Sequence, residues 1–332
     1  MKNKKRLGVG SKFFIAFSLV YAGTIVTWLI LQGIYGDTWR WLYFANIVAV
    51  FLFIPLIVQF IIAIFTNNTT AWVSFGTVLI VGVYLFGGLF LPSLEKNTST
   101  QSVTVMTTNI LAIRRQTAPV IQAIRLADPD IVAIQELNAE LADDIESTLS
   151  TDYPYQLLNL DTGFGGMGII SKYPFTQQQV NFSAPWYVGY PQVVQVEVNG
   201  KEFRLINLHG QPPDASEQGF MQTNELRNWQ AQDLVSLVSY DDVPVIAVGD
   251  LNATPQNDAY KIMRTGLDDA WTKQGFGLGH TRQNLFKDIP PKWFVRIDYI
   301  FHSPDLQTIS AEIGPWDGSS DHRPVIAEIG LP

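Results

Sequence analysis

The distribution of apolar and polar residues divides the chain into two unlike parts. No charged residue occurs from Phe13 to Gly36 or from Trp41 to Leu94, whereas soluble domains have about 25% charged residues. A helix rises about 1.5 Å per residue, so about 20 apolar residues cross a bilayer core. The pattern predicts three transmembrane helices at about 13–35, 41–65 and 71–91, and the polar run "TNNTT" separates the second from the third.

These apolar stretches have two other interpretations. Lys2, Lys4, Lys5 and Arg6 precede the first stretch, as in a cleavable signal peptide, but the stretch is too long and no small-residue cleavage site follows it. A buried helical hairpin in a soluble domain is the alternative for the other two, but so long an uncharged stretch disfavours it. Pro55 is expected to kink the second helix, which neighbouring helices tolerate.

The distribution of basic residues predicts the orientation in the membrane. Five basic residues lie before or at the start of the first span: Lys2, Lys4, Lys5, Arg6 and Lys12. The first loop has only Asp37 and Arg40, and the second loop has no charge. Because basic residues favour the cytoplasmic side, we expect the N-terminus to be cytoplasmic and the chain after three crossings to be extracytoplasmic at the cell membrane.

From Gln101 onward the pattern changes to short β-branched runs separated by helical segments. Eight runs predict strands: "SVTVMTTNI", "DIVAIQEL", "MGIISKYPF", "VVQVEVNG", "FRLINLHG", "VPVIAVGDLN", "VRIDYIFHS" and "RPVIAEIG". The segments "APVIQAIRLADP" and "QTNELRNWQAQDLVSLVSY" predict amphipathic helices. We therefore expect a membrane anchor at 1–92, a linker at 93–102 and a strand-rich α/β domain at 103–332.

Charge narrows the classes of partner for this domain. Residues 101–332 contain 15 Lys and Arg against 28 Asp and Glu, a net charge of −13. An acidic surface is repelled by polyanions, which disfavours a processive nucleic-acid binder without excluding a nuclease that works through bound metal. The absence of cysteine does not bear on export, because a domain with a core of this size does not require disulfides.

Polar residues interrupt the predicted strands at or near their ends. Glu136 follows the apolar run "IVAIQ", where a carboxylate costs several kcal/mol unless it is paired or bound to metal. One such residue fits an ordinary buried network, but a set of them indicates a site. The set is Asn109, Glu136, His209, Asp250, Asn252, Asp298, Asp321 and His322.

These residues lie within motifs that resemble a known family. "TTNI", "IQEL", "NLHG", "GDLNATP", "RIDYIF" and "SSDHRPV", in this order, are similar to the successive motifs of the endonuclease/exonuclease/phosphatase superfamily. Its members include DNase I-like nucleases, abasic-site endonucleases, inositol-polyphosphate phosphatases and bacterial sphingomyelinases. The resemblance covers nearly all of 101–332 and implies a DNase I-like α/β sandwich of two sheets, preceded here by three transmembrane helices.

The resemblance implies a metal site. Phosphoester hydrolysis must neutralise a phosphoryl oxygen, and Mg²⁺ does so while taking one or two carboxylates and keeping several waters. Glu136 is expected to be the main ligand, and Asn109 is expected to orient the metal or the phosphate. Asp321 is expected to approach the metal directly or through water. We expect Mg²⁺, with Mn²⁺ as the alternative.

The resemblance also implies catalytic roles. Asp250 would position and polarise the attacking water, and Asn252 would bind the phosphate. His322 would donate a hydrogen bond to the phosphoryl oxygen while Asp298 holds its ring. His209 would contact the scissile phosphate or protonate the leaving group.

Some positions depart from the family pattern. Leu111 stands where some members have an acidic residue, so a second metal ligand is missing there. Tyr187 and Tyr190 are the nearest candidates for a Tyr or Arg that nuclease members use. His280 and His302 have no motif context and are expected to be structural.

Three functions follow as hypotheses. The first is a membrane-anchored, metal-dependent phosphoester hydrolase acting on a lipid-linked phosphate or pyrophosphate, or on another phosphodiester. The three spans resemble those of membrane-tethered bacterial members associated with glycopeptide-antibiotic resistance. The second is a membrane-tethered nuclease, which the acidic charge disfavours. The third is a non-catalytic membrane or scaffold protein, which the presence of every main site residue disfavours.

Overall fold

The computed structural model describes residues 8–93, 98–113, 116–161, 163–214, 216–239, 243–284 and 290–332. The chain divides into two compact units, Met1–Leu91 and Pro92–Pro332. The basic residues Lys2, Lys4, Lys5 and Arg6, and positions 94–97 of the expected linker, lie outside the described residues.

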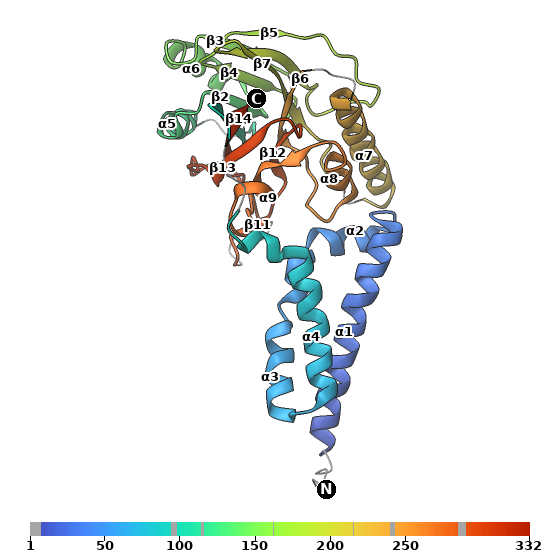
Figure 1. The fold of residues 1–332 in the computed structure, drawn as a ribbon. Helices are drawn as coiled ribbons and strands as arrows, with labels where there is room; N and C mark the ends of the chain where they lie inside the picture. Colours follow the sequence, from blue (N-terminus) through green and yellow to red (C-terminus); the bar gives the residue numbers. More distant parts are fainter. Residues whose placement is uncertain are drawn as a thin grey trace. The chain divides into compact units, whose positions relative to one another are not determined.

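The N-terminal unit is helical (Figure 1). Its elements are α1 (Val9–Tyr35), α2 (Arg40–Ile47), the 3₁₀ helix η1 (Ala49–Phe53), α3 (Leu56–Thr66), α4 (Thr69–Phe86) and the 3₁₀ helix η2 (Gly87–Phe90). Three segments are long and apolar enough to cross a membrane: Val9–Tyr35, Ala49–Thr66 and Thr69–Phe90. Three such helices were predicted, and the second starts later than expected because α2 is a separate short helix. Pro55, which has no amide N–H, separates η1 from α3.

Polar side chains join the helices of this unit. Nε1 of Trp28 on α1 donates to Oδ1 of Asn46 on α2 at 3.0 Å. Nε2 of Gln59 on α3 donates to the carbonyl oxygen of Ser18 on α1 at 3.0 Å. Because hydrocarbon offers no hydrogen-bond partner, such bonds favour association of the helices over their separation in lipid.

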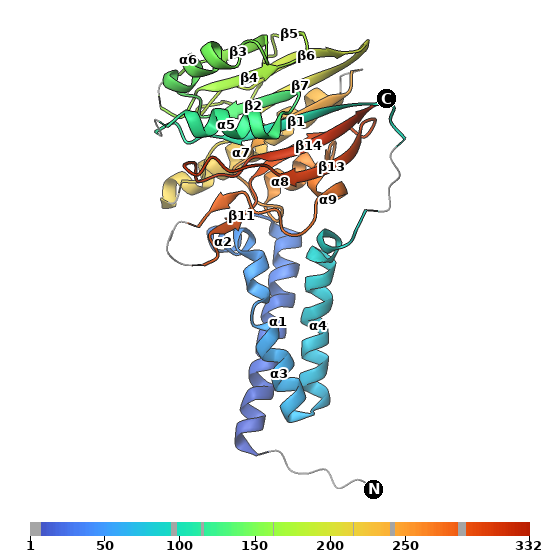
Figure 2. The ribbon, with the colours of Figure 1, turned by 90° about the vertical axis from the view of Figure 1, so that its left-hand side faces the viewer.

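The second unit is built around two sheets of six strands each (Figure 2). The first has the order β13-β14-β1-β2-β4-β3 and the second β5-β6-β7-β8-β12-β9, and β10 pairs with β11 apart from them. The strands of the first sheet are β1 (Gln101–Asn109), β2 (Ile131–Gln135), β3 (Tyr155–Asn159), β4 (Met167–Ser171), β13 (Gln307–Ile313) and β14 (Val325–Leu331). The other strands are β5 (Phe175–Gln177), β6 (Gln192–Val198), β7 (Lys201–His209), β8 (Val245–Asp250), β9 (Asp268–Asp269), β10 (Arg282–Gln283), β11 (Trp293–Val295) and β12 (Asp298–His302).

Alternation along the strands builds the core between the sheets. Val103 and Val105 of β1 lie in one buried cluster with Phe203 and Leu205 of β7. The intervening positions of the first sheet pack against α5 (Ala118–Ala127) and α6 (Ala139–Thr148). Those of the second sheet pack against α7 (Glu217–Ser239) and α8 (Asp258–Met263); the helix α9 (Ala270–Gln274) follows β9. The result is the predicted two-sheet α/β sandwich with helices on both outer faces, and the fold prediction is confirmed.

The topology brings several strand ends to one edge. Strands β1 and β2 are parallel and joined through α5, and β7 and β8 are parallel and joined through α7. The C-terminal ends of these four strands therefore share an edge of the sandwich. Because β12 runs antiparallel to β8, and β14 runs antiparallel to β1, these two strands begin at the same edge.

Candidate active site

The expected site residues occupy this shared edge. Asn109, His209 and Asp250 are the last residues of β1, β7 and β8, and Glu136 directly follows β2. Asp298 begins β12 opposite Asp250, and Asp321 and His322 precede β14. The structure thus brings residues from 109 to 322 together because parallel strands end, and antiparallel strands begin, at one edge.

The carboxylates of Glu136 and Asp250 converge on one amide. Nδ2 of Asn109 donates to Oε1 of Glu136 at 3.0 Å and to Oδ2 of Asp250 at 3.2 Å. The second oxygen of Glu136 accepts the N–H of Ala112 at 3.0 Å. All three side chains belong to buried residues. The two buried carboxylates therefore share one neutral donor, and a nearby cation would stabilise their charged forms.

Left-handed backbone positions aim these side chains. The φ angles are 59° at Glu136, 59° at Leu111 and 53° at Asn252. Asparagine tolerates this region, but for glutamate and leucine it costs about 1–3 kcal/mol each. Gly249 has a φ of 143°, and a Cβ there would collide with the carbonyl oxygen of Leu208 on the neighbouring strand. The backbone next to these strand ends therefore adopts costly conformations, and these conformations fix where the polar side chains lie.

Both histidines face Asp250 across similar gaps. Nε2 of His209 lies 3.8 Å from Oδ2 of Asp250 and 4.0 Å from Oε1 of Glu136. Nε2 of His322 lies 3.8 Å from the same Asp250 oxygen and 3.9 Å from Oδ1 of Asp321. These separations are too long for hydrogen bonds, so each Nε2 faces carboxylate oxygens without a direct bond to them.

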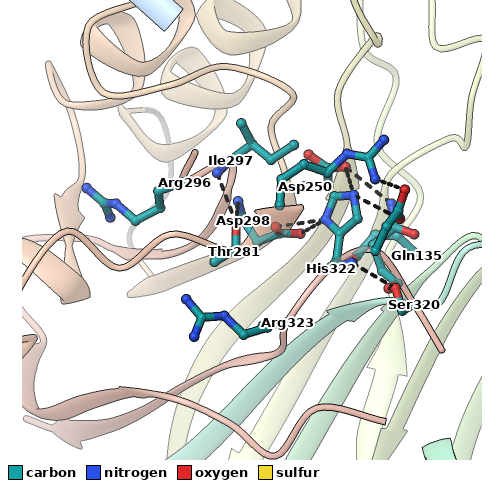
Figure 3. Close-up of polar contacts among 12 residues, drawn as sticks. Gln135, Asp250, Thr281, Arg296, Ile297, Asp298, Ser320, His322 and Arg323 are labelled. Carbon is teal, nitrogen blue, oxygen red and sulfur yellow. Dashed lines mark hydrogen bonds and ion pairs between the residues drawn. The ribbon is translucent and has the colours of Figure 1, made fainter. Parts of the chain in front are cut away.

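Asp298 holds the ring of His322 from the other side. Nδ1 of His322 lies 3.0 Å from Oδ1 and 2.9 Å from Oδ2 of Asp298 (Figure 3). The N–H of Asp298 donates to Oγ1 of Thr281 at 3.2 Å, and the N–H of His322 donates to Oγ of Ser320 at 3.0 Å. The imidazole is thereby oriented with Nε2 toward Asp250.

Burial and charge set the protonation of this group. Burial raises the pKa of Asp250, and the neighbouring Asp298 carboxylate raises it further; His322 and His209 act in the opposite direction. Burial lowers the pKa of His322, but Asp298 and Asp250 together more than offset this, so its pKa lies above the ordinary value. A charged His322 donates from both ring nitrogens, to Asp298 through Nδ1 and to an incoming oxygen through Nε2.

Asn252 is held next to the strand ends. Its N–H donates to Oδ1 of Asp250 at 2.8 Å, and its Nδ2 donates to the carbonyl oxygen of Gly210 at 2.9 Å. Asn252 therefore ties the loop after β8 to the loop after β7. Its amide is engaged with the chain, so binding phosphate would require an exchange of partner.

Asp321 has a partner that the sequence did not suggest. Its Oδ2 forms an ion pair with Nη1 of Arg282, whereas its Oδ1 is buried without a hydrogen bond among the described residues. The side chain of Asp321 is 17% exposed and that of Arg282 is 30% exposed. Only one carboxylate oxygen of Asp321 is thus directed to the site.

The donor set fits a hard divalent ion. Glu136 and Asp250 supply buried carboxylate oxygens that share the Asn109 amide, and Mg²⁺ is commonly bound by one or two carboxylates together with substrate phosphates. A second grouping, Asp250, Asp298 and His322, has ligand atoms within 4.8 Å of one another. Because the oxygens of Asp298 face Nδ1 of His322, we assign that pair to ring orientation and the Glu136 side to the metal.

Several supporting residues were missed from the sequence. Nε2 of Gln135 donates to Oδ1 of Asn207 at 2.7 Å, and Nδ2 of Asn207 donates to Oε1 of Gln192 at 3.0 Å. These fully buried amides join the two sheets directly beneath Glu136 and His209. These amides are polar residues within apolar strand runs, which is a visible signal in the sequence, but the predicted site includes only polar residues at strand ends.

The remaining expectations fall outside this cluster. His302 is buried, with Nδ1 2.8 Å from the carbonyl oxygen of Ser303 and Nε2 2.7 Å from Oγ1 of Thr308. Nδ1 of His280 lies 3.2 Å from the carbonyl oxygen of Trp293. Both contacts agree with structural roles. The side chains of Tyr187 and Tyr190 are exposed, and Oη of Tyr190 donates to the carbonyl oxygen of Val180.

The sequence of this chain matches a family model, and its fold is similar to that of several solved structures. A family model described as "Endonuclease/Exonuclease/phosphatase family" matches residues 106–322. No curated protein matches the sequence. Among solved structures, an endonuclease/exonuclease/phosphatase from Bacteroides vulgatus is 22% identical, with a TM-score of 0.55 over 70% of this chain and 100% of that one.

Two further structures have the same fold. A humanized D. rerio TDP2 is 16% identical, with a TM-score of 0.55 over 69% of this chain and 98% of that one. Sphingomyelinase C from Streptomyces griseocarneus is 20% identical, with a TM-score of 0.50 over 69% of this chain and 99% of that one.

Proposed function

Because the chain belongs to the endonuclease/exonuclease/phosphatase family, whose members are metal-dependent phosphoester hydrolases, we propose that it is a membrane-anchored hydrolase of lipid-linked phosphates or pyrophosphates. We further propose that its catalytic domain, at 103–332, is extracytoplasmic. The observation that carries the proposal is the convergence of two imidazoles and three carboxylates, with Nε2 of His209 and of His322 each 3.8–4.0 Å from carboxylate oxygens of Glu136, Asp250 or Asp321. A phosphoryl group and its attacking water require such a cradle of donors and acceptors.

The side chains have complementary roles in this proposal. When bound, a divalent ion, Mg²⁺ or Mn²⁺, would supply charge neutralisation at a phosphoryl oxygen, and Glu136 with Asn109 would hold it. Asp250 accepts a hydrogen bond from the attacking water and directs it at phosphorus. His322, charged and held by Asp298, donates to the phosphoryl oxygen through Nε2. The bond from phosphorus to the leaving oxygen breaks, and His209 is placed to donate the proton that oxygen needs.

The anchor and the charge support a lipid substrate over nucleic acid. Three apolar helices keep the domain at a bilayer, which raises the effective concentration of lipid phosphates. The net charge of −13 over residues 101–332 opposes long-range attraction of DNA. This combination also favours the membrane-tethered bacterial type that the sequence resembles, so we infer that the protein is of that type. A tethered nuclease remains the competing function.

Phosphate release by the full chain in detergent tests the proposal. The substrates are a polyprenyl diphosphate, a phospholipid and plasmid DNA, each with Mg²⁺ and with chelator. We expect turnover of the lipid phosphates that chelator abolishes. Glu136→Gln should be inactive, whereas Asp305→Asn, the same chemical change at an exposed position outside the site, should be normal. DNA nicking without lipid turnover would replace this proposal with the nuclease.

A further inference from the structure

Arg282 lies beside the site, where its guanidinium is partly exposed. It begins β10, and a backbone bridge pairs it with His322, so its position relative to the catalytic ring is fixed. The neighbouring N–H of Gln283 donates to the carbonyl oxygen of Asp321 at 2.8 Å. Arg282 is therefore attached to the segment 321–322 through both its backbone and its side chain.

The ion pair of Arg282 leaves its guanidinium partly exposed to solvent. Its ion pair with Asp321 involves a guanidinium that is 30% exposed, and such partly exposed pairs contribute little to stability. A partly exposed guanidinium next to the catalytic imidazole can therefore exchange Asp321 for an incoming anion.

Two other arginines near this segment, in the part of the chain that the structure describes, are engaged elsewhere. Arg296 is buried and its Nη1 lies 2.8 Å from Oδ2 of Asp269. The guanidinium of Arg323 donates to the carbonyl oxygen of His280 and lies 4.5 Å from the ring centre of Trp293. In Figure 3, Arg296 and Arg323 point away from the His322 ring. Of these three arginines, Arg282 is thus the one placed to meet a ligand at the edge of the site.

The carboxylate of Asp321 is the anion that Arg282 contacts in this structure. Oδ2 contacts Arg282, while Oδ1, on the other side of the same carboxylate, lies 3.9 Å from Nε2 of His322. One carboxylate group therefore spans the distance between the guanidinium of Arg282 and Nε2 of His322, where the phosphoryl group is proposed to bind. A substrate with a single phosphate fills the first place only, and a diphosphate fills both.

We propose that Arg282 binds a second phosphate group next to the scissile one, so that the preferred substrates are diphosphates. Resting on the proposed function, this inference narrows the substrate class for the same site. In the complex, the planar guanidinium exchanges Asp321 for two oxygens of the second phosphate, a bidentate contact that lysine does not reproduce. Hydrolysis consumes one water, breaks the bond between phosphorus and the bridging oxygen, and releases inorganic phosphate and the monophosphate ester.

The test compares two substrates on the full chain in detergent with Mg²⁺. Farnesyl diphosphate supplies two phosphates, and bis(p-nitrophenyl) phosphate supplies one. We expect Arg282→Met to lower kcat/KM for the diphosphate by about 10-fold or more, mainly through KM, and to lower the ratio of the two kcat/KM values by a similar factor. The kcat/KM of Arg282→Lys for the diphosphate should fall between those of the wild type and Arg282→Met, because lysine keeps the positive charge but lacks the planar guanidinium that makes two parallel hydrogen bonds.

Controls separate this inference from folding and from the proposed function. Lys292→Met removes a nearby exposed cation that lies over Trp316, and should leave the ratio unchanged. Equal losses on both substrates in Arg282→Met and Arg282→Lys would overturn the role of Arg282 while leaving the hydrolase standing. A wild type inactive on both substrates would overturn the proposed function, and the inference with it.

Discussion

Nδ1 of His322 lies 2.9 Å from Oδ2 of Asp298, although 24 residues separate them in the chain. Asp298 is fixed by β12, where it pairs with Asp250 on β8. The orientation of a loop histidine is therefore set by a strand of the sandwich and not by the loop. The same strand pairing places Asp250 in front of the ring that Asp298 holds from behind.

Replacement of Asp298 by asparagine tests this relationship. The pKa of His322 is raised by Asp298 and Asp250, so the charged ring persists above its ordinary pH range and is lost as pH rises through the folded pKa. Asp298→Asn removes one carboxylate, lowers the pKa of His322 and moves the alkaline limb of the pH–rate profile to lower pH. We expect kcat to fall about 100-fold at neutral pH. A profile that keeps its alkaline limb would show that His322 does not act in its charged form.

Metal binding should stabilise the protein independently of turnover. A ligand that binds the folded state raises stability in proportion to the logarithm of its concentration over Kd. We expect Mg²⁺ or Mn²⁺ to raise Tm and chelator to reverse the change. In Glu136→Gln the shift should be lost, and in His322→Ala it should remain while activity falls. Retention of the full shift in Glu136→Gln would move the metal to the Asp250, Asp298 and His322 grouping.

Because the sequence contains no cysteine, single cysteines can report the predicted topology directly. Thr38, Thr70 and Thr100 are exposed positions in the first loop, at the start of α4 and before β1. In intact cells, we expect an impermeant maleimide to label cysteine at 38 and 100 but not at 70. Permeabilised cells should allow labelling at all three. Labelling confined to position 70 in intact cells would reverse the orientation and place the catalytic domain in the cytoplasm.

The amide network beneath the site should be important for stability. Asn207 contacts Gln135 and Gln192 and donates to the carbonyl oxygens of Ile134 and Gly168. Asn207→Ala would leave several buried groups without partners and cost about 3 kcal/mol, or a fall in Tm of about 6–12 °C. Differential scanning fluorimetry in detergent measures this. The matched control is Gln177→Ala on the exposed edge strand β5, which should change Tm little.

A buried histidine outside the site predicts the response to acid. Burial lowers the pKa of His302, so the folded state binds fewer protons than the unfolded state below about pH 6.5. Stability should therefore fall as pH drops below that value, toward the folded pKa. His302→Gln should have a shallower loss of Tm between pH 7 and pH 5 than the wild type. An identical slope in the two proteins would assign the acid sensitivity to other groups.

Local pattern was sufficient for the architecture. β-branched runs with apolar alternation identified most strands, and uncharged stretches identified three apolar helices. Strands β3, β5, β9, β10, β11 and β13 were not predicted as separate strands. Of these, β3 and β13 are edge strands that lie only partly buried, so their residues are more polar and the runs are less distinct. The others have only two or three residues each, too few for a pattern. The start of the second apolar helix was also misplaced, because hydropathy does not distinguish α2 from the helix that follows.

Pairings across the chain were not accessible to the sequence. The strand-end polar residues could be collected from their positions, but their roles remain predictions. The contact of Arg282 with Asp321 depends on the backbone bridge between Arg282 and His322, which are 40 positions apart in the sequence. No hydrophobic periodicity predicts such a bridge. The partners of Gln135 depend likewise on how two separate sheets stack. Such contacts depend on how strands and sheets pack in three dimensions, and the pattern of residues in a single sequence does not specify that packing.

The pairing of β14 with β1 has a consequence for when the enzyme becomes active. Gln101 lies opposite Leu331, and Asp321 and His322 reach the site only when this last strand has docked beside the first. A chain that is still being synthesised has Glu136, Asp250 and Asn252 long before it has an imidazole at position 322. Contacts so distant in sequence also form slowly. Hydrolysis should therefore begin only after delivery and folding of the whole domain, and the nascent chain would be catalytically silent during its synthesis.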